Sequence, residues 1–248
     1  MISRNFGCQK LGDLWRVRGY SDEISSKCVC KTGSKVNVFI LSTGRCGSTT
    51  IIRACEHIAN FSSSHESRKH LIGEARLDYP ENHIESDNRL SWFLGRLEQR
   101  YGDDAIYIHL RRETMATANS YANRTSVKAG IMKAYRNGIL PRLSDETEDL
   151  AVAMDYCDTV DSNIELFMKN KSHKMCFSLE NAASDFPKFW SLINAEGDIG
   201  PALDEFNTSY NKSKIGPGKL EVVLTSPIRV IKKLVRLFAG LPTYIREA

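Results

Sequence analysis

The chain has 248 residues, of which 42% are hydrophobic and 26% charged, and its formal net charge at neutral pH is +4. That length and apolar fraction can bury one sizeable core, which predicts a single main domain. The net charge suits the binding of an anionic small molecule but is far too small to indicate a nucleic-acid partner. Because the sequence has no long apolar run and no secretory leader pattern, we expect a soluble, cytoplasmic protein.

Seven cysteines are scattered along the chain, and their odd number is typical of reduced thiols in a reducing compartment. Cys28 and Cys30, with Cys8 upstream, have poor spacing for zinc, because neither a second cysteine pair nor a histidine lies nearby. We therefore predict that the protein holds no metal. The oligomeric state is left open by the sequence.

The apolar stretch from Val38 to Leu41 predicts a buried strand that leads into a loop rich in glycine and hydroxyl side chains, and then into a helix. Gly44 and Gly47 allow a tight turn and a close approach to an anion, and the first amides of a helix attract phosphate. Arg45 adds a full positive charge. The anion-binding residues predicted for this loop are Thr43, Gly44, Arg45, Cys46, Gly47, Ser48, Thr49 and Thr50.

This loop departs from the P-loop of nucleotide-hydrolysing enzymes. Aligning Gly47 with the second glycine of G-x-x-x-x-G-K-[ST] places Ser42 at the first glycine and Ser48 at the lysine that clamps the β- and γ-phosphates. The pattern strand-x-x-x-[R/K]-x-G-[S/T]-[S/T] is instead similar to the 5′-phosphosulfate loop of sulfotransferases. Enzymes of that family use 3′-phosphoadenosine 5′-phosphosulfate as the donor.

A second segment supports the same resemblance. Residues 105–110 predict a buried strand, and a helix is expected to begin near Thr114, which can act as its cap. In the sulfotransferase family an arginine at the strand end and a serine eight positions later bind the 3′-phosphate of the nucleotide. Arg112 and Ser120 have that spacing, whereas the competing choice, Arg111, would put Asn119 at the serine position.

The surrounding elements predict a three-layer α/β fold with a mainly parallel central sheet and a P-loop-like phosphosulfate-binding loop. Residues 87–101 have an amphipathic pattern, so we expect a helix there that ends at Gly102. Further along, the pattern predicts a long helix at 145–170, a strand at 174–178 and a helix at 185–194. Alternation of helices and strands in this order favours right-handed parallel units.

Transfer to a hydroxyl requires a base, because an alcohol is a poor nucleophile until its proton is being removed. The tyrosylprotein and bacterial carbohydrate sulfotransferases, which the chain resembles, use a Glu that follows the helix after the phosphosulfate loop. Glu66, 21 positions after Arg45, corresponds to that residue. His65 is the alternative base, because another branch of the family uses a histidine, and Glu74 and Glu85 are lesser candidates.

Cys46 lies within the phosphosulfate loop but has no expected catalytic role. Beside Arg45 and a helix N-terminus, its thiol should have a lowered pKa and be a target for alkylation.

The ends of the chain are interpreted separately from the domain at 36–225. Residues 1–35 form an N-terminal extension, and 226–248 form a basic C-terminal helix whose segment 228–238 could rest on an anionic membrane surface. Within the domain, a basic loop resembles one that closes over the cofactor in several sulfotransferases. Lys212 and Lys214 of this loop are candidate 3′-phosphate ligands.

Together these features predict an enzyme that transfers a sulfuryl group from 3′-phosphoadenosine 5′-phosphosulfate to an acceptor hydroxyl, with a carbohydrate the expected acceptor. Glu66 would take the acceptor proton, while Arg45 and Ser48 stabilise the growing negative charge. Arg112 and Ser120 would hold the other end of the nucleotide. Two alternatives remain: a P-loop phosphotransferase, and a protein of sulfotransferase fold that binds a nucleotide or glycan without catalysis.

Overall fold

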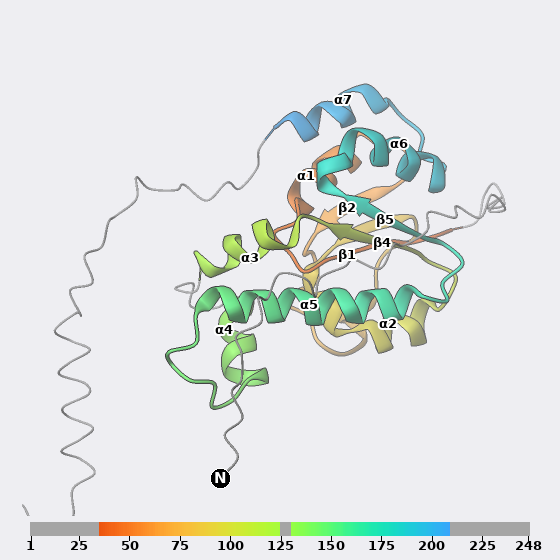
Figure 1. Ribbon diagram of the computed structural model, residues 1–248. Helices are drawn as coiled ribbons and strands as arrows, with labels where there is room; N and C mark the ends of the chain where they lie inside the picture. Colours follow the sequence, from red (N-terminus) through yellow and green to blue (C-terminus); the bar gives the residue numbers. More distant parts are fainter. Residues whose placement is uncertain (1–34, 125–129, 209–248) are drawn as a thin grey trace, which may run out of the picture. The chain divides into compact units, whose positions relative to one another are not determined.

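The computed structural model describes residues 35–124 and 130–208, and a five-stranded sheet lies at the centre of this part of the chain (Figure 1). All the strand pairings are parallel, and the order across the sheet is β2-β3-β1-β4-β5. The strands are β1 (Val38–Leu41), β2 (Ser62–His65), β3 (His83–Ser86), β4 (Ile106–Arg111) and β5 (Lys174–Ser178).

Helices connect these strands. The α-helices in the described ranges are α1 (Ser48–Cys55), α2 (Leu94–Tyr101), α3 (Thr114–Ala122), α4 (Ile131–Ala134), α5 (Asp149–Met168), α6 (Ala182–Leu192) and α7 (Ile199–Asp204). The short turns of helix are η1 (Gly73–Leu77), η2 (Asn88–Trp92), η3 (Tyr135–Ile139, a π-helix), η4 (Leu179–Asn181) and η5 (Glu205–Asn207).

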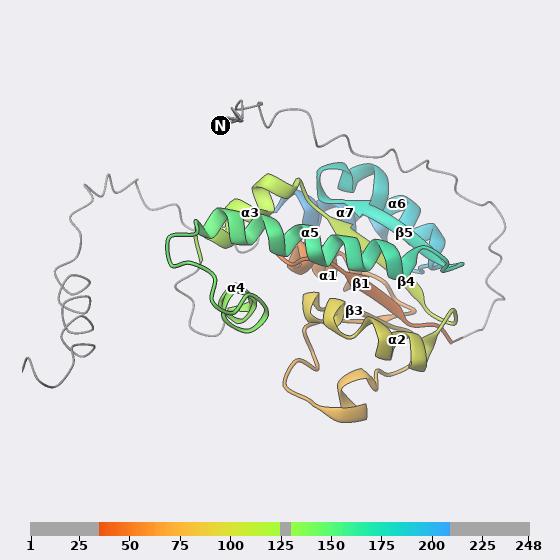
Figure 2. The ribbon, with the colours of Figure 1, turned by 60° about the horizontal axis from the view of Figure 1, so that its bottom comes forward.

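Helices cover both faces of the sheet, as is usual for parallel sheets. Successive side chains of a strand point to opposite sides and so pack into two separate cores. In β1, Val38 and Ile40 pack into a core with residues of α1, α6 and α7. Phe39 and Leu41 pack into the opposite core, which includes residues of α2, α3 and α5. Figures 1 and 2 show the corresponding helices on either side of the strands. The predicted three-layer α/β fold with a parallel central sheet is confirmed.

The position of β1 determines where a ligand can bind. The chain adds β2 and β3 on one side of β1 and then β4 and β5 on the other side, so the strand order changes direction at β1. In open parallel sheets, ligands bind at the carboxyl ends of the strands beside such a point. The loop that follows Leu41 begins there.

Several predicted elements have other boundaries. The strand at 174–178 is confirmed, and β4 and α3 follow the predicted strand and helix closely. Glu113, rather than Thr114, caps α3, because its carboxylate accepts from the amides of the first turn. The long helix begins at Asp149 instead of 145, and the helix predicted at 185–194 begins earlier, at Ala182.

The predicted single helix at 87–101 is wrong, because the segment is split into η2 and α2. The Asp87 carboxylate accepts from the amide of Arg89 at 2.8 Å and starts a 3-10 turn. Ser91 then donates to the carbonyl of Ser42 at 3.2 Å, which attaches η2 to the loop after β1. No helix in the described ranges is both long enough and apolar enough to cross a membrane.

Candidate active site

The loop after β1 has three residues in the left-handed region: Gly44 at φ 84°, Arg45 at φ 61° and Gly47 at φ 86°. The amide of Gly44 donates to the Ser42 hydroxyl at 3.1 Å, which closes the first turn of the loop. A Cβ atom on Gly44 would lie 2.4 Å from the hydroxyl oxygen of Tyr121. Both the backbone conformation and the packing therefore require glycine at this position.

Two tyrosines and a cysteine support the loop from the protein interior. The hydroxyls of Tyr121 and Tyr156 donate to the carbonyl of Thr43 at 2.6 and 2.8 Å. The Cys46 thiol donates to the carbonyl of Gly44 at 3.2 Å and lies 3.0 Å from the Thr43 hydroxyl. These contacts hold the loop against α3 and α5.

The expectation of a reactive Cys46 is wrong. Its side chain is turned beneath the loop, and the residue is only 2% exposed. Burial raises the pKa of the Cys46 thiol to about 11, and the hydrogen bond with Thr43 offsets only part of that effect. The thiol is therefore protonated at neutral pH and supports the loop structurally.

Hydrogen bonds join the two predicted phosphate-binding segments. Arg45 Nε donates to the Ser120 hydroxyl at 3.0 Å, across 75 positions of sequence. Arg112 Nη1 donates to the carbonyl of Arg45 at 3.3 Å. Arg111 points elsewhere and pairs with Glu165 of α5 at 3.1 Å. Of the two candidate arginines, Arg112 is therefore the one that contacts the loop.

Positive charge accumulates at this junction. Burial lowers the pKa of Arg45, and the nearby charges of Arg124 and Arg112 lower it further. The three guanidinium groups are close enough to interact, so the junction is favourable for an anion. Arg124 was not among the residues predicted from sequence. It lies four positions after Ser120, in the turn that follows the end of α3 at Ala122.

Glu66 follows directly after β2 in a strained turn with φ 51°. Its amide donates to the carbonyl of Ser86 at 3.0 Å. The next residue, Ser67, donates to both oxygens of Glu85, from its amide at 2.8 Å and from its hydroxyl at 2.6 Å. Glu85 is fully buried and also contacts His83 at 3.2 Å, so it holds the turn instead of facing a substrate.

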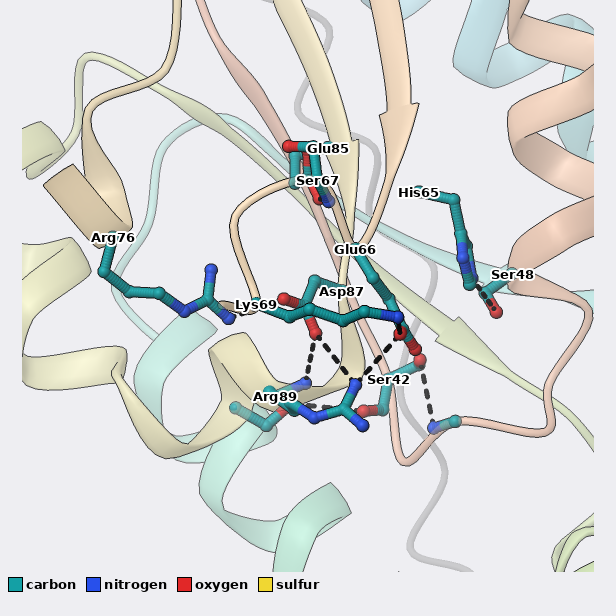
Figure 3. Close-up of polar contacts among 12 residues, drawn as sticks. Ser42, Ser48, His65, Glu66, Ser67, Lys69, Arg76, Glu85, Asp87 and Arg89 are labelled. Carbon is teal, nitrogen blue, oxygen red and sulfur yellow. Dashed lines mark hydrogen bonds and ion pairs between the residues drawn. The ribbon is translucent and has the colours of Figure 1, made fainter. Parts of the chain in front are cut away.

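The Glu66 carboxylate is bound at one oxygen. Oε2 lies 3.0 Å from Lys69 Nζ and 3.0 Å from Arg89 Nη1 (Figure 3). Oε1 has no hydrogen-bond partner among the residues that the structure describes. Burial raises the pKa of Glu66, but the Lys69 hydrogen bond and the charges of Arg89 and His65 outweigh it, so the pKa is lowered. Glu66 is therefore a carboxylate at neutral pH with one oxygen open.

His65, at the end of β2, contacts the loop. Its Nε2 lies 2.9 Å from the Ser48 hydroxyl at the start of α1. Figure 3 shows this pair apart from the group of Glu66, Lys69 and Arg89. The two candidate bases thus have different partners although they are adjacent in sequence.

The structure describes some of the remaining candidate residues and not others. Thr49 lies in the first turn of α1, Thr50 is buried in the same helix, and Glu74 is exposed in η1. Lys212, Lys214, the segment 228–238 and nearly all of the 1–35 extension lie outside the described residues. In the described ranges, no group of three or more His, Cys, Asp or Glu side chains is arranged to hold a metal.

Arg89, Asp87 and Lys69 are site residues that the sequence reasoning missed. Asp87 directly follows β3, and the carboxyl ends of neighbouring parallel strands meet at one edge of a sheet. That position was a usable signal. The amphipathic pattern of 87–101 predicts one continuous helix and so gives no sign of the separate turn at 88–92.

Comparisons with known proteins found limited similarity. No family model and no curated protein match the chain. Among solved structures, it is similar to mouse sulfotransferase SULT7A1 complexed with PAP, with 15% sequence identity and a TM-score of 0.45. That match covers 71% of this chain and 68% of the mouse chain. Similarity at this level does not carry the activity of the mouse protein over to this one.

Proposed function

We propose that this protein is a sulfotransferase that moves a sulfuryl group from 3′-phosphoadenosine 5′-phosphosulfate to an acceptor hydroxyl. The observation that carries the proposal is the meeting of two other segments of the chain with the loop after β1. Ser120 and Arg112 bond to Arg45 of the loop at 3.0 and 3.3 Å, and His65, beside Glu66, contacts Ser48 at 2.9 Å. The order of these segments along the chain is the one that the sulfotransferase resemblance requires.

The residues at this edge of the sheet fit an anionic donor. The left-handed loop turns its backbone tightly at the start of α1, an arrangement that suits phosphate and sulfate groups. We assign the 5′ end of the donor to the loop with Ser48, and the 3′-phosphate to Arg112 and Ser120. The backbone of Arg45 is part of the loop, and its side chain donates to Ser120. Arg45 can therefore neutralise negative charge between the 5′ end and the 3′-phosphate of the donor. Lys212 and Lys214 stay candidates for the same nucleotide.

Glu66 is the proposed general base. Its open oxygen, Oε1, takes the proton from the acceptor hydroxyl while the acceptor oxygen forms a bond to sulfur. The bond between sulfur and the bridging oxygen breaks, and the nucleotide leaves as 3′-phosphoadenosine 5′-phosphate. Arg45 and Ser48 stabilise the charge that grows on the leaving oxygen.

Ser48 favours sulfuryl over phosphoryl transfer. A P-loop phosphotransferase has a lysine at this position to clamp the β- and γ-phosphates, and a serine cannot replace that charge. We propose a carbohydrate as the acceptor class and the cytoplasm as the location. The four cysteines in the described ranges are free thiols, which agrees with a reducing compartment.

The test is transfer of radiolabelled sulfate from the donor to a panel of glycans and small alcohols. We expect labelled product with at least one glycan, formed about 10² to 10⁴-fold more slowly by the Glu66→Gln variant. Binding of the donor without transfer to any acceptor would instead support a non-catalytic nucleotide-binding protein. Product formed only from small alcohols would leave the reaction class intact and contradict the carbohydrate assignment.

A further inference from the structure

We propose that Arg89 is a positioning residue that holds Oε2 of Glu66 and thereby presents Oε1 to the acceptor hydroxyl. This inference rests on the proposed function, because it concerns the base of that reaction. Arg89 Nη1 forms an ion pair with Glu66 Oε2 at 3.0 Å, and Lys69 donates a hydrogen bond to the same oxygen. A carboxylate bound at one oxygen cannot rotate freely, so the other oxygen keeps a defined direction.

A buried ion pair fixes the position of Arg89. Asp87 is fully buried, and its Oδ2 lies 2.5 Å from Nη2 of Arg76, which is also buried. The other oxygen, Oδ1, accepts from the Arg89 amide at 2.8 Å and lies 3.9 Å from the Arg89 guanidinium. Arg76 and Asp87 therefore hold the start of η2, and η2 holds Arg89.

The same short helix also contacts the phosphosulfate loop. Ser91 Oγ donates to the carbonyl of Ser42 at 3.2 Å, and Leu90 between Arg89 and Ser91 is completely buried. Arg89 and Ser91 are two positions apart in η2, so one short turn contacts both the loop and Glu66. Arg89 thus links the position of the base to the position of the loop.

Lys69 lacks this support and serves as the matched control. Its side chain is 53% exposed, compared with 34% for Arg89, and its only described ion pair is with Glu66. An exposed lysine on a flexible stem contributes little to a fixed geometry. Both cations contact Oε2, Lys69 through a hydrogen bond and Arg89 through an ion pair whose buried Nη1 lacks hydrogen-bond geometry, so Arg89 acts by its fixed charge.

The experiment compares Arg89→Met, Arg89→Lys and Lys69→Met in the full chain. For each variant, turnover is measured against pH, donor affinity by calorimetry, and folding by thermal melting. A second readout needs no activity: the ¹³C signal of the Glu66 carboxyl is followed through a pH titration and assigned with Glu66→Gln. Glu66 is faced by Lys69, Arg89 and His65, so the Lys69 variant controls for simple loss of charge.

We expect Arg89→Met to lower kcat by up to about 10²-fold, with unchanged donor affinity and only a small fall in melting temperature, similar to that of Lys69→Met. In Arg89→Met, the acid limb of the turnover–pH profile and the midpoint of the Glu66 carboxyl titration should both move to higher pH. Arg89→Lys should restore part of the turnover, and Lys69→Met should cost at most about fivefold, the range of an exposed ion pair. Equal losses in Arg89→Met and Lys69→Met would overturn the positioning role.

The proposed function and this inference fail in different ways. If the wild-type protein transfers no sulfate to any acceptor, the function is wrong, but the carboxyl titration still reports whether Arg89 controls Glu66. If transfer occurs and the Glu66 signal titrates identically in Arg89→Met and wild type, the function stands and Arg89 is only a surface charge.

Discussion

Glu66 and His65 are neighbours in sequence, but they have different chemical surroundings. Glu66 Oε2 contacts two cations, whereas His65 Nε2 contacts the Ser48 hydroxyl. Sequence could name both residues as candidate bases. It could not separate them, because the direction of each side chain depends on the turn held by Glu85 and Ser67.

Exchange of the two candidate bases separates their roles. Glu66→Gln keeps the shape of the side chain but cannot accept a proton, so turnover should fall by about 10² to 10⁴-fold while donor affinity survives. His65→Ala should have the smaller effect, since it removes a contact to Ser48 and not the proton acceptor. The measurement is turnover with the best acceptor, alongside calorimetry of the donor. Near-normal turnover in Glu66→Gln together with loss in His65→Ala would make His65 the base.

The pH dependence of turnover gives an independent test. The pKa of Glu66 is lowered, so the carboxylate persists as pH falls below the ordinary glutamate range near 4.3. Turnover should therefore stay level from about pH 8 to pH 5.5. The ion pairs of Glu66 stabilise the fold over the same range and are lost only as pH falls through its lowered pKa. An imidazole base would instead lose activity near pH 6.5, and a limb there would contradict the assignment.

Cys46 illustrates the limit of residue-level prediction. A thiol beside an arginine and a helix N-terminus looks reactive in sequence, yet this one is turned toward Thr43 and Thr117 beneath the loop. In the native protein, alkylation mapped by mass spectrometry should therefore modify the exposed Cys176 well before Cys46. Rapid labelling of Cys46, with protection by bound nucleotide, would contradict the buried geometry.

At the scale of elements, the sequence predicts three of the five strands and the loop, but neither β2 and β3 nor the break in the helix expected at 87–101. β1, β4 and β5 are apolar runs that end at polar residues, and Gly44 and Gly47 occur where φ is positive. Asp87 caps η2, and Ser91 of η2 bonds to the distant Ser42, a contact that no local pattern reveals. The overlooked Arg89 belongs to that broken segment.

The junction of β4 and α3 provides a matched pair of arginines. Arg112→Ala should weaken nucleotides that carry a 3′-phosphate by about 1.5 to 3 kcal/mol, the value of a charged hydrogen bond, and leave nucleotides without it nearly unaffected. Arg111→Ala should leave the affinity for both kinds of nucleotide nearly unchanged, because Arg111 pairs with Glu165 on the surface. Calorimetry with both nucleotide types measures the ratio. Equal weakening of the two types by Arg112→Ala would mean that its bond to the Arg45 carbonyl is purely structural.

For the whole molecule, the parallel α/β architecture followed from the alternation of apolar strands with helices. The position of the candidate site depends on the strand order, which brings the carboxyl ends of β1, β2, β3 and β4 to one edge of the sheet. The predicted roles of Lys212, Lys214 and the segment 228–238 remain predictions, because these residues lie outside the described ranges.

The central claim is that the site accepts a nucleotide with a 3′-phosphate, and thermal unfolding tests it without any acceptor. Saturating 3′-phosphoadenosine 5′-phosphate, at about 100 times its dissociation constant, should raise the free energy of unfolding by about 2.7 kcal/mol. That corresponds to a melting-temperature increase of about 5 °C or more, with no metal added. ATP with Mg²⁺ at the same concentration should give a much smaller increase. Equal or greater stabilisation by ATP with Mg²⁺ would contradict the sulfotransferase account and favour a phosphotransferase.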